Sequence, residues 1–375
     1  MKILLGALGV ALVLVVFWDA FETLILPRRV SRRFRIARAF YRTTWSLWTL
    51  GARVPRTTPR RETYLSYYGP LSLLFLLAVW GGGLILGFAL MIEGVGRVHA
   101  AGAHTFLSLV YLSASTFFTL GLGDITPANR LGRLVTVAEA GAGLAFLALV
   151  ISYLPVLYQS FSRREVRISL LDERAGSPPS AGELLGRRGP VYAESGLQFL
   201  REWELWCAEL LESHLSYPVL AYFRSQHDNQ SWLSALTVIL DACALVMAGM
   251  AEITDSQARL TFAMARHAAV DLAAILGTPP VRGGVDRLPP EGLDRLRRHI
   301  SESGLTPAAG ERAGEELRSL RATYEPYLRA LSAHLRMPLP AWMPAEEASD
   351  NWEVTAWEGR PARRWMRRGP SPRQH

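Results

Sequence analysis

The stretch Thr119-Leu120-Gly121-Leu122-Gly123-Asp124 lies between two long apolar segments and is the most informative part of the 375-residue chain. Its glycines at alternate positions let the backbone adopt conformations that residues with a Cβ avoid, so successive carbonyl groups can point at one axis. A ring of such carbonyls can replace the water that a cation loses when it enters a narrow pore. The sequence therefore predicts that these six residues form a selectivity filter for cations.

The segments around this stretch have the lengths that a membrane pore requires. An amphipathic run over residues 104–118 predicts a short pore helix, whose C-terminal dipole would favour a cation. Two uncharged stretches, residues 64–92 and 140–162, are each long enough to cross a hydrocarbon core of about 30 Å. We expect an outer helix over 64–92 and an inner helix over 131–162, with the pore helix and filter re-entering between them.

With these flanks, the six residues resemble the T-V-G-Y-G-D signature of the potassium channel pore family, and the resemblance covers residues 65–160. The chain departs from the signature at Leu120 and Leu122. The resemblance implies that the carbonyls of residues 119–122 and the Thr119 hydroxyl bind permeating K⁺. We expect no other metal and no cofactor. It implies a homotetramer, because one chain supplies one filter strand. We assign ion binding to Thr119, Leu120, Gly121, Leu122, Gly123 and Asp124.

The inner helix carries further candidates. Gly143 has the spacing of the family's gating hinge, and Pro155 removes a backbone donor and should kink the helix. Glu139 is an ionisable residue inside a membrane helix, and we place it behind the filter near Ser115 or Arg133. It either braces the filter or makes a structural contact between helices. Our candidate pore and gate residues are Glu139, Gly143, Leu144, Leu147, Ile151 and Pro155.

Leu122 stands where the family has a tyrosine that packs against aromatic residues of the pore helix. The matching pore-helix positions are Tyr111 and Leu112, so aliphatic packing replaces at least part of an aromatic cuff. We expect a potassium-permeable channel, and the nearest alternative is a weakly selective monovalent cation channel. An alternative from another class is a non-conducting membrane sensor or scaffold with a vestigial pore. No catalytic signature is present, so we expect no enzyme.

A third apolar segment, residues 1–27, precedes a basic loop. We expect a membrane helix here and not a cleaved signal peptide, because a small-x-small cleavage site is lacking. The loop over residues 28–62 has 11 arginines before its one acidic residue, Glu62, and is predicted to be cytoplasmic. The protein would then be a multi-pass cell-membrane protein with its N-terminus outside and its C-terminal domain in the cytoplasm.

The basic loop has aromatic and arginine residues at helical spacing, which indicates an interfacial helix against anionic lipid of the inner leaflet. The net charge of +8 fits that membrane surface, and we expect no nucleic-acid partner. A voltage-sensor helix is an alternative, with Asp19 and Glu22 as counter-charges for arginines at three-residue spacing: Arg29, Arg32, Arg35 and Arg38. That alternative lacks a membrane-spanning segment of its own, because the first span ends at Pro27.

The second half of the chain has mixed polarity and predicts a helical cytoplasmic domain over 196–345, after a linker over 166–195 and before a basic tail over 346–375. Periodicity predicts helices over residues 197–215, 231–250, 257–276, 292–300 and 311–335. The fold class is therefore an all-α membrane protein, with spanning helices, a re-entrant pore helix and filter, and an α-helical cytoplasmic domain.

Two features of that domain have alternative interpretations. Residues 233–250 could form a fourth span, but Asp241 in the middle favours a buried bundle helix. Cys207 and His214 share one helix face, with His227-Asp228 downstream, but a zinc site requires four ligands at tighter spacing. The sequence identifies no ligand for this domain.

Overall fold

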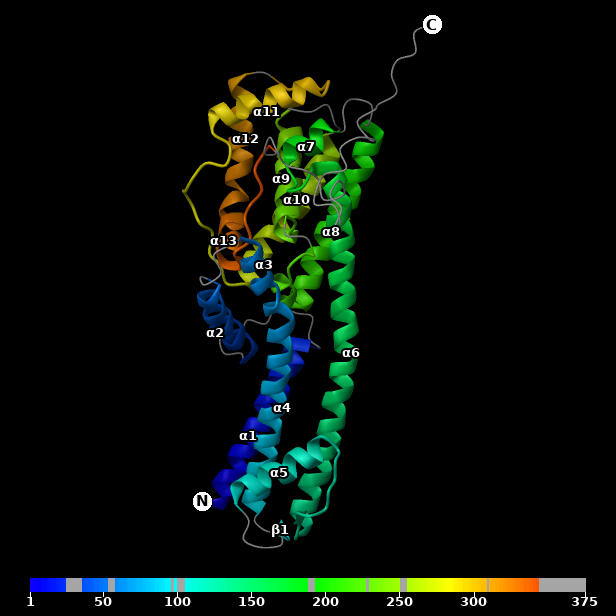
Figure 1. The fold of residues 1–375 in the computed structure, drawn as a ribbon, viewed down its shortest axis with the longest axis vertical. Coiled ribbons are helices and arrows are strands. Elements are labelled where there is room, and N and C mark those ends of the chain that lie inside the picture. The colour runs from blue at the N-terminus through cyan, green and yellow to red at the C-terminus, as the bar shows by residue number, and fades with distance from the viewer. Residues whose placement is uncertain are drawn as a thin grey trace. The chain divides into compact units, whose positions relative to one another are not determined.

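The structure is a computed structural model that describes residues 1–24, 36–52, 58–95, 98–99, 105–187, 193–226, 229–249, 255–308 and 310–343. Helices dominate these residues (Figure 1). The two short strands among the described residues, β1 (Val98–His99) and β2 (Thr126–Pro127), form one antiparallel pair. The chain divides into two compact units, Met1–Ser160 and Phe161–His375. The all-α membrane fold expected from the sequence is confirmed.

In the part of the chain that the structure describes, three helices are long and apolar enough to cross a membrane: α1 (Lys2–Leu24), α4 (Tyr68–Val95) with the short helix α3 (Thr58–Ser66) before it, and α6 (Arg130–Ala175). α1 and α4 pack along much of their length. A Cβ on Gly9 would lie 2.5 Å from the Gly87 carbonyl oxygen, and a Cβ on Gly94 would lie 2.5 Å from the Gly6 Cα. Small residues thus let the two backbones touch, as is typical of membrane helix pairs.

The amphipathic helix α2 (Ile36–Gly51) is held at its N-terminus by an acid from α1. The buried Asp19 carboxylate accepts hydrogen bonds from the backbone N–H groups of Ile36 (2.9 Å) and Ala37 (3.1 Å), and from the Trp80 indole of α4 (3.0 Å). A carboxylate at a helix N-terminus is favoured by the helix dipole. Asp19 therefore joins three helices. Arg29, Arg32 and Arg35 of the voltage-sensor alternative lie outside the described residues.

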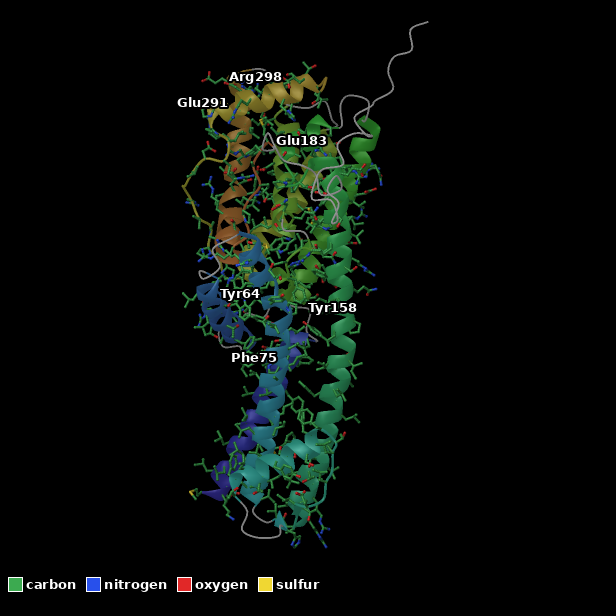
Figure 2. The ribbon with its side chains drawn as sticks, in the orientation of Figure 1. Tyr64, Phe75, Tyr158, Glu183, Glu291 and Arg298 are labelled. Carbon is green, nitrogen blue, oxygen red and sulfur yellow. The ribbon has the colours of Figure 1, made fainter. Side chains whose placement is uncertain are left out.

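One face of α2 is aromatic and packs on α3 and α4. Trp48 stacks on Tyr64 with ring centroids 4.7 Å apart, and Phe40 meets Phe75 at 5.3 Å. Figure 2 shows Tyr64 and Phe75 beside this helix. Leu47 is exposed on one flank of this packed face, and two arginines, Arg38 and Arg42, are exposed on the other side of the helix. α2 therefore has the amphipathic character that the sequence predicts for an interfacial helix.

The second unit is a helical bundle around α9 (Trp232–Met247), whose residues are nearly all buried. The remaining helices are α7 (Ala181–Gly186), α8 (Ala193–Ser216), the 3₁₀-helix η2 (Pro218–Tyr222), α10 (Asp255–Ile275), α11 (Pro290–Glu302), α12 (Glu311–Ala322) and α13 (Glu325–Leu335). α10 packs on both α8 and α9. The stretch that could pass for a fourth span is thus the central helix of this bundle.

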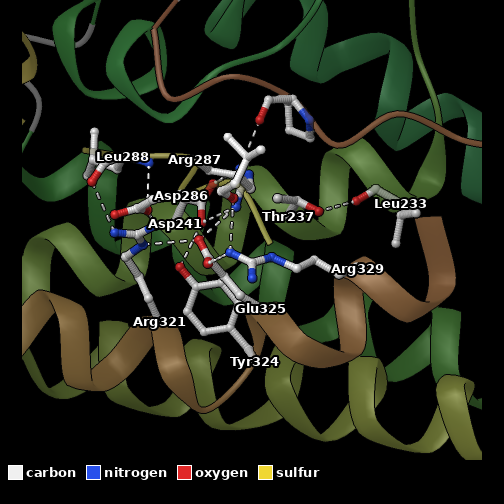
Figure 3. Close-up of polar contacts among 12 residues, drawn as sticks. Leu233, Thr237, Asp241, Asp286, Arg287, Leu288, Arg321, Tyr324, Glu325 and Arg329 are labelled. Carbon is white, nitrogen blue, oxygen red and sulfur yellow. Dashed lines mark hydrogen bonds and ion pairs between the residues drawn. The ribbon is translucent and has the colours of Figure 1, made fainter. Parts of the chain in front are cut away.

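Asp241 of α9 is tolerated in this core because a polar network surrounds it (Figure 3). Its carboxylate pairs with Arg287 at 2.6 Å and accepts a hydrogen bond from the Tyr324 hydroxyl at 2.6 Å. Glu325 in turn pairs with Arg287 and Arg321, at 3.3 and 3.0 Å. A buried charge is sustained only when it is paired and hydrogen-bonded. These contacts explain how an acid can occupy the middle of an apolar helix.

The region expected as a linker is largely helical. α6 continues to Ala175, beyond the expected end at residue 162, and α7 and the start of α8 also lie within 166–195. The continuation of α6 buries one apolar face, formed by Ile168, Leu171 and Ala175. Charged residues between these positions make the apolar pattern hard to recognise in the sequence. The helix expected over 311–335 is divided into α12 and α13, because Pro326 starts a new helix at its first turn.

The part of α6 that belongs to the second unit is fastened by a buried arginine. Arg164 is 4% exposed, and it donates hydrogen bonds to the carbonyls of Leu220 (2.9 Å) and Phe223 (2.8 Å) and pairs with Glu165 (2.9 Å). His214 lies 3.4 Å from the same guanidinium. Burial, reinforced by Arg164, lowers the pKa of His214 to about 3, so its ring is neutral.

Candidate pore and filter

The pore helix expected over 104–118 corresponds to α5 (Phe106–Phe117). Thr105 caps it, in a reciprocal capping box with Ser108, and Phe118 ends it. His104 lies outside the described residues. α5 is held against α4 by a small apolar cluster that includes Leu109 and Ile92. The cluster fixes the direction in which the C-terminus of α5 points.

Residues 119–124 leave the end of α5 in an alternating backbone conformation. The N–H groups of Leu120 (2.8 Å) and Gly121 (3.3 Å) donate to the Ser115 carbonyl. Positive φ angles recur at Thr119 (59°), Gly121 (59°) and Gly123 (78°). The two glycines adopt this conformation without a Cβ penalty, whereas Thr119 adopts it against its side-chain preference. The glycines could be expected from the sequence but the positive φ of Thr119 could not, because a residue with a Cβ gives no signal for it.

The side chains of the candidate filter, residues 119–124, are not covered by other residues of the same chain. Leu120 and Leu122 are 65% and 62% exposed, and the other four filter residues are exposed as well. Exposed leucines in a membrane segment need lipid or another chain around them.

The two expected cuff positions differ in their surroundings. Leu112 is buried in the apolar cluster between α4 and α5. Tyr111 is 41% exposed, and Asp124 is a charged group near its hydroxyl. Tyr111 of the pore helix therefore lies near Asp124, a proximity that the sequence did not predict.

Beyond the filter, the chain returns to the end of α4. β2 pairs with β1, and the Asn129 side chain donates to the Val95 carbonyl (3.1 Å) and accepts from the Gly132 N–H (2.7 Å). Asn129 thus caps the start of α6 and ties it to the last residue of α4. These contacts connect the end of the outer helix to the start of the inner helix, on either side of the pore loop.

Gly143 lies where α6 crosses the end of the pore helix. An ideal Cβ there would be 2.1 Å from the Phe117 carbonyl oxygen and 2.9 Å from its carbonyl carbon. α6 is helical through both Gly143 and Pro155. The close approach of the α6 and α5 backbones therefore explains why a glycine, and no larger residue, fits at position 143.

The three other pore candidates on α6 share one exposed stripe. Leu144, Leu147 and Ile151 are 61%, 54% and 63% exposed, and their spacing places them on one helix face. Pro155 is exposed farther along the helix. This apolar stripe is available to line a pore or to meet another chain.

Glu139 is fully buried, on a different side of α6. Its hydrogen-bond partner is the Ser113 hydroxyl of α5, not Ser115 or Arg133 as the sequence suggested. Ser113 also lies 2.7 Å from the Ile85 carbonyl of α4. The expected position behind the filter strand is compatible with this contact, because Ser113 precedes Ser115 by two residues.

Within the described residues, no group of three or more His, Cys, Asp or Glu side chains could hold a metal ion. Cys207 and Cys243 are free and buried, and His214 hydrogen-bonds the Leu210 carbonyl. His227 and Asp228 of the zinc alternative lie outside the described residues.

Fold and pore loop together define a membrane protein with a pore domain between two spanning helices. A family model described as "Ion channel" matches residues 74–159, which run from α4 through residues 119–124 into α6. The chain belongs to this ion channel family.

Two curated bacterial proteins are similar to the chain. Protein LctB of Geobacillus stearothermophilus is 32% identical over 97 residues, which cover 22% of this chain and 69% of that protein. The uncharacterized membrane protein YdjJ of Bacillus subtilis is 25% identical over 204 residues, which cover 50% of this chain and 56% of that protein. The chain thus spans little more than half the length of YdjJ. No solved structure matches.

Proposed function

We propose that the protein is a homotetrameric, potassium-permeable channel that conducts monovalent cations passively across the membrane. The observation that carries this proposal is the alternation of positive φ angles at residues 119, 121 and 123, directly after a pore helix. Such alternation turns successive carbonyls towards one side of the strand. In the tetramer, the carbonyls of residues 119–122 and the Thr119 hydroxyl would replace the hydration shell of K⁺.

The tetramer is supported by what a single chain leaves uncovered. The filter leucines, Leu120 and Leu122, are exposed, as are the α6 residues Leu144, Leu147 and Ile151. Four copies around an axis would enclose the filter leucines. The exposed α6 residues would then line the wall of a cavity. Asp124 would place a ring of carboxylates at the mouth of the filter, where it attracts cations.

For orientation, we propose that the N-terminus lies outside and that the second unit is cytoplasmic. The arginines of residues 28–61 support this topology through the positive-inside rule. α2 would then lie at the inner leaflet, with Leu47 towards lipid tails and with Arg38 and Arg42 near anionic headgroups.

Flux through liposomes that contain the purified protein tests the function. A reversal potential near that of K⁺ supports the potassium channel, and a potential near zero in mixed K⁺ and Na⁺ supports the weakly selective alternative. Absence of flux from correctly assembled protein would favour the sensor or scaffold with a vestigial pore.

Leu122 should limit selectivity. Because aliphatic packing leaves the filter more deformable than a tyrosine cuff, we expect a permeability ratio of K⁺ over Na⁺ below that of tyrosine-filter channels. Leu122→Tyr should raise the ratio by about tenfold, which corresponds to about 1.4 kcal/mol. Bi-ionic reversal potentials measure it, with Leu131→Tyr as a control at an equally exposed position outside the filter. A wild-type ratio already equal to that of tyrosine-filter channels would contradict the argument.

The orientation can be measured with single cysteines at exposed arginines. An impermeant thiol reagent applied outside intact cells should label Arg130→Cys, at the start of α6, and spare Arg38→Cys and Arg163→Cys. Cys207 and Cys243 are buried, so background labelling should be low. Labelling of Arg38→Cys from outside would reverse the topology.

A further inference from the structure

One buried hydroxyl connects the three helices of the pore domain. Ser113 of α5 is 0% exposed, and its oxygen lies 2.7 Å from the Ile85 carbonyl oxygen of α4 and within hydrogen-bonding distance of Glu139 Oε1 of α6. The three groups are therefore an outer-helix acceptor, a pore-helix hydroxyl and an inner-helix carboxyl.

The number of protons at this junction limits how it can be bonded. A serine hydroxyl has one proton, and a backbone carbonyl can only accept. The contact between Ser113 and Ile85 therefore uses the hydroxyl proton. The proton in the second contact must then come from Glu139, which requires a carboxylic acid. With an ionised carboxylate, two of the three oxygens would face each other without a proton between them.

The surroundings of Glu139 agree with a neutral acid. Its second oxygen, Oε2, is buried and has no hydrogen-bond partner. An ionised carboxylate in this position would have one donor at most, and the penalty for burying it would be large. Asp19 of the same unit is the contrast, because three donors converge on its carboxylate.

Charged neighbours do not change this conclusion. α4 has no charged residue between 69 and 92, and α5 has none; the one ionisable residue of α5, Tyr111, is influenced by Asp124. On α6 itself the nearest cation in sequence is Arg133, which is exposed. No cation among these groups is placed to neutralise a carboxylate at Glu139.

We propose that Glu139 is a neutral carboxylic acid whose O–H donates a hydrogen bond to the Ser113 hydroxyl oxygen. Through this bond it acts as a positioning residue for the filter. The bond fixes α5 at Ser113, two residues before Ser115. The Ser115 carbonyl accepts hydrogen bonds from the N–H groups of Leu120 and Gly121. A shift of α5 would move that carbonyl and the start of the filter strand with it. The effect on conduction rests on the proposed channel function, whereas the protonation state does not.

Conduction separates the donor from the charge. Glu139→Gln keeps a neutral donor, and its flux and selectivity should remain within about twofold of the wild type. Glu139→Ala removes the donor and should lower the permeability ratio of K⁺ over Na⁺ by about tenfold, the range of one lost hydrogen bond with a buried partner left behind. Ser113→Ala should behave like Glu139→Ala. If Glu139→Gln is as impaired as Glu139→Ala, the negative charge is what matters and the proposal fails.

Infrared spectroscopy of the reconstituted protein tests the protonation state without reference to flux. At neutral pH, the wild type should show the carbonyl stretch of a protonated carboxylic acid, shifted by ¹³C-glutamate labelling. The band should vanish in Glu139→Gln and persist in Glu93→Gln, a control at the end of α4. Absence of the band from assembled wild-type protein overturns the proposal. A band in protein that conducts nothing leaves Glu139 neutral and removes the channel function instead.

Discussion

Gly143→Ala is expected to abolish cation flux and to reduce recovery of assembled protein. The added Cβ would lie 2.1 Å from the Phe117 carbonyl oxygen, and the Phe117 atoms around it are all backbone. Neither helix can relieve this overlap by turning a side chain. α6 would have to move away from the end of α5, and overpacking of this kind costs about 1–3 kcal/mol or more in each chain.

The matched control is Gly141→Ala, in the same helix. A Cβ at Gly141 has nothing within 4 Å, and alanine is a better helix former than glycine. Liposome flux and size-exclusion chromatography of both variants measure the difference. If Gly143→Ala assembles and conducts like Gly141→Ala, the close crossing of α5 and α6 is incorrect.

Gly121→Ala should also abolish flux, but by another route. Gly121 has a φ of 59°, and a Cβ there would meet nothing within 4 Å in its own chain. The cost is therefore conformational, about 1–2 kcal/mol per residue for an L-amino acid in the left-handed region. In a tetramer this cost occurs four times around one ring, and a flipped peptide at this position turns a carbonyl away from the axis.

The two glycine variants should therefore differ in assembly. Gly121→Ala is expected to assemble normally and fail to conduct, and Gly82→Ala serves as control because that helical glycine also has free space around it. Tetramer yield and K⁺ flux together make the comparison. Normal flux through Gly121→Ala would remove the basis for assigning residues 119–124 to the filter.

The spans and the pore loop could be predicted because their signals are local. Length and apolarity define α1, α4 and α6, and alternate glycines mark the backbone after α5. The N-cap at Thr105 is likewise a short-range pattern. Each of these features depends on residues a few positions apart, which the sequence places next to one another.

Contacts between distant residues were not predictable in the same way. Glu139 was expected near Ser115 or Arg133, but the packing of α6 on α5 brings it to Ser113. Leu112 was considered as an aliphatic residue near the filter, and its packing against α4 was not foreseen. Both outcomes depend on how helices rotate against each other, which one sequence does not specify.

The extension of α6 and the role of Asp19 were missed for a related reason. Charges in residues 163–174 obscure a narrow buried stripe, and only the bundle around it makes that stripe recognisable. Asp19 was considered as a counter-charge, whereas its carboxylate receives the N-terminus of α2 and the Trp80 indole. A pattern of charges indicates that a partner exists but does not identify it.

Arg164 restricts the kind of movement that the end of α6 can make. A twist of these turns by one residue, about 100° about the helix axis, would withdraw the guanidinium from the Leu220 and Phe223 carbonyls. Breaking such a buried charged contact costs about 3–5 kcal/mol. Rotation of α6 about its own axis is therefore resisted. Tilting or translation of α6 together with η2 keeps the hydrogen bonds of Arg164 to these carbonyls intact. A mechanical signal at this end of α6 would travel as a displacement and not as a rotation.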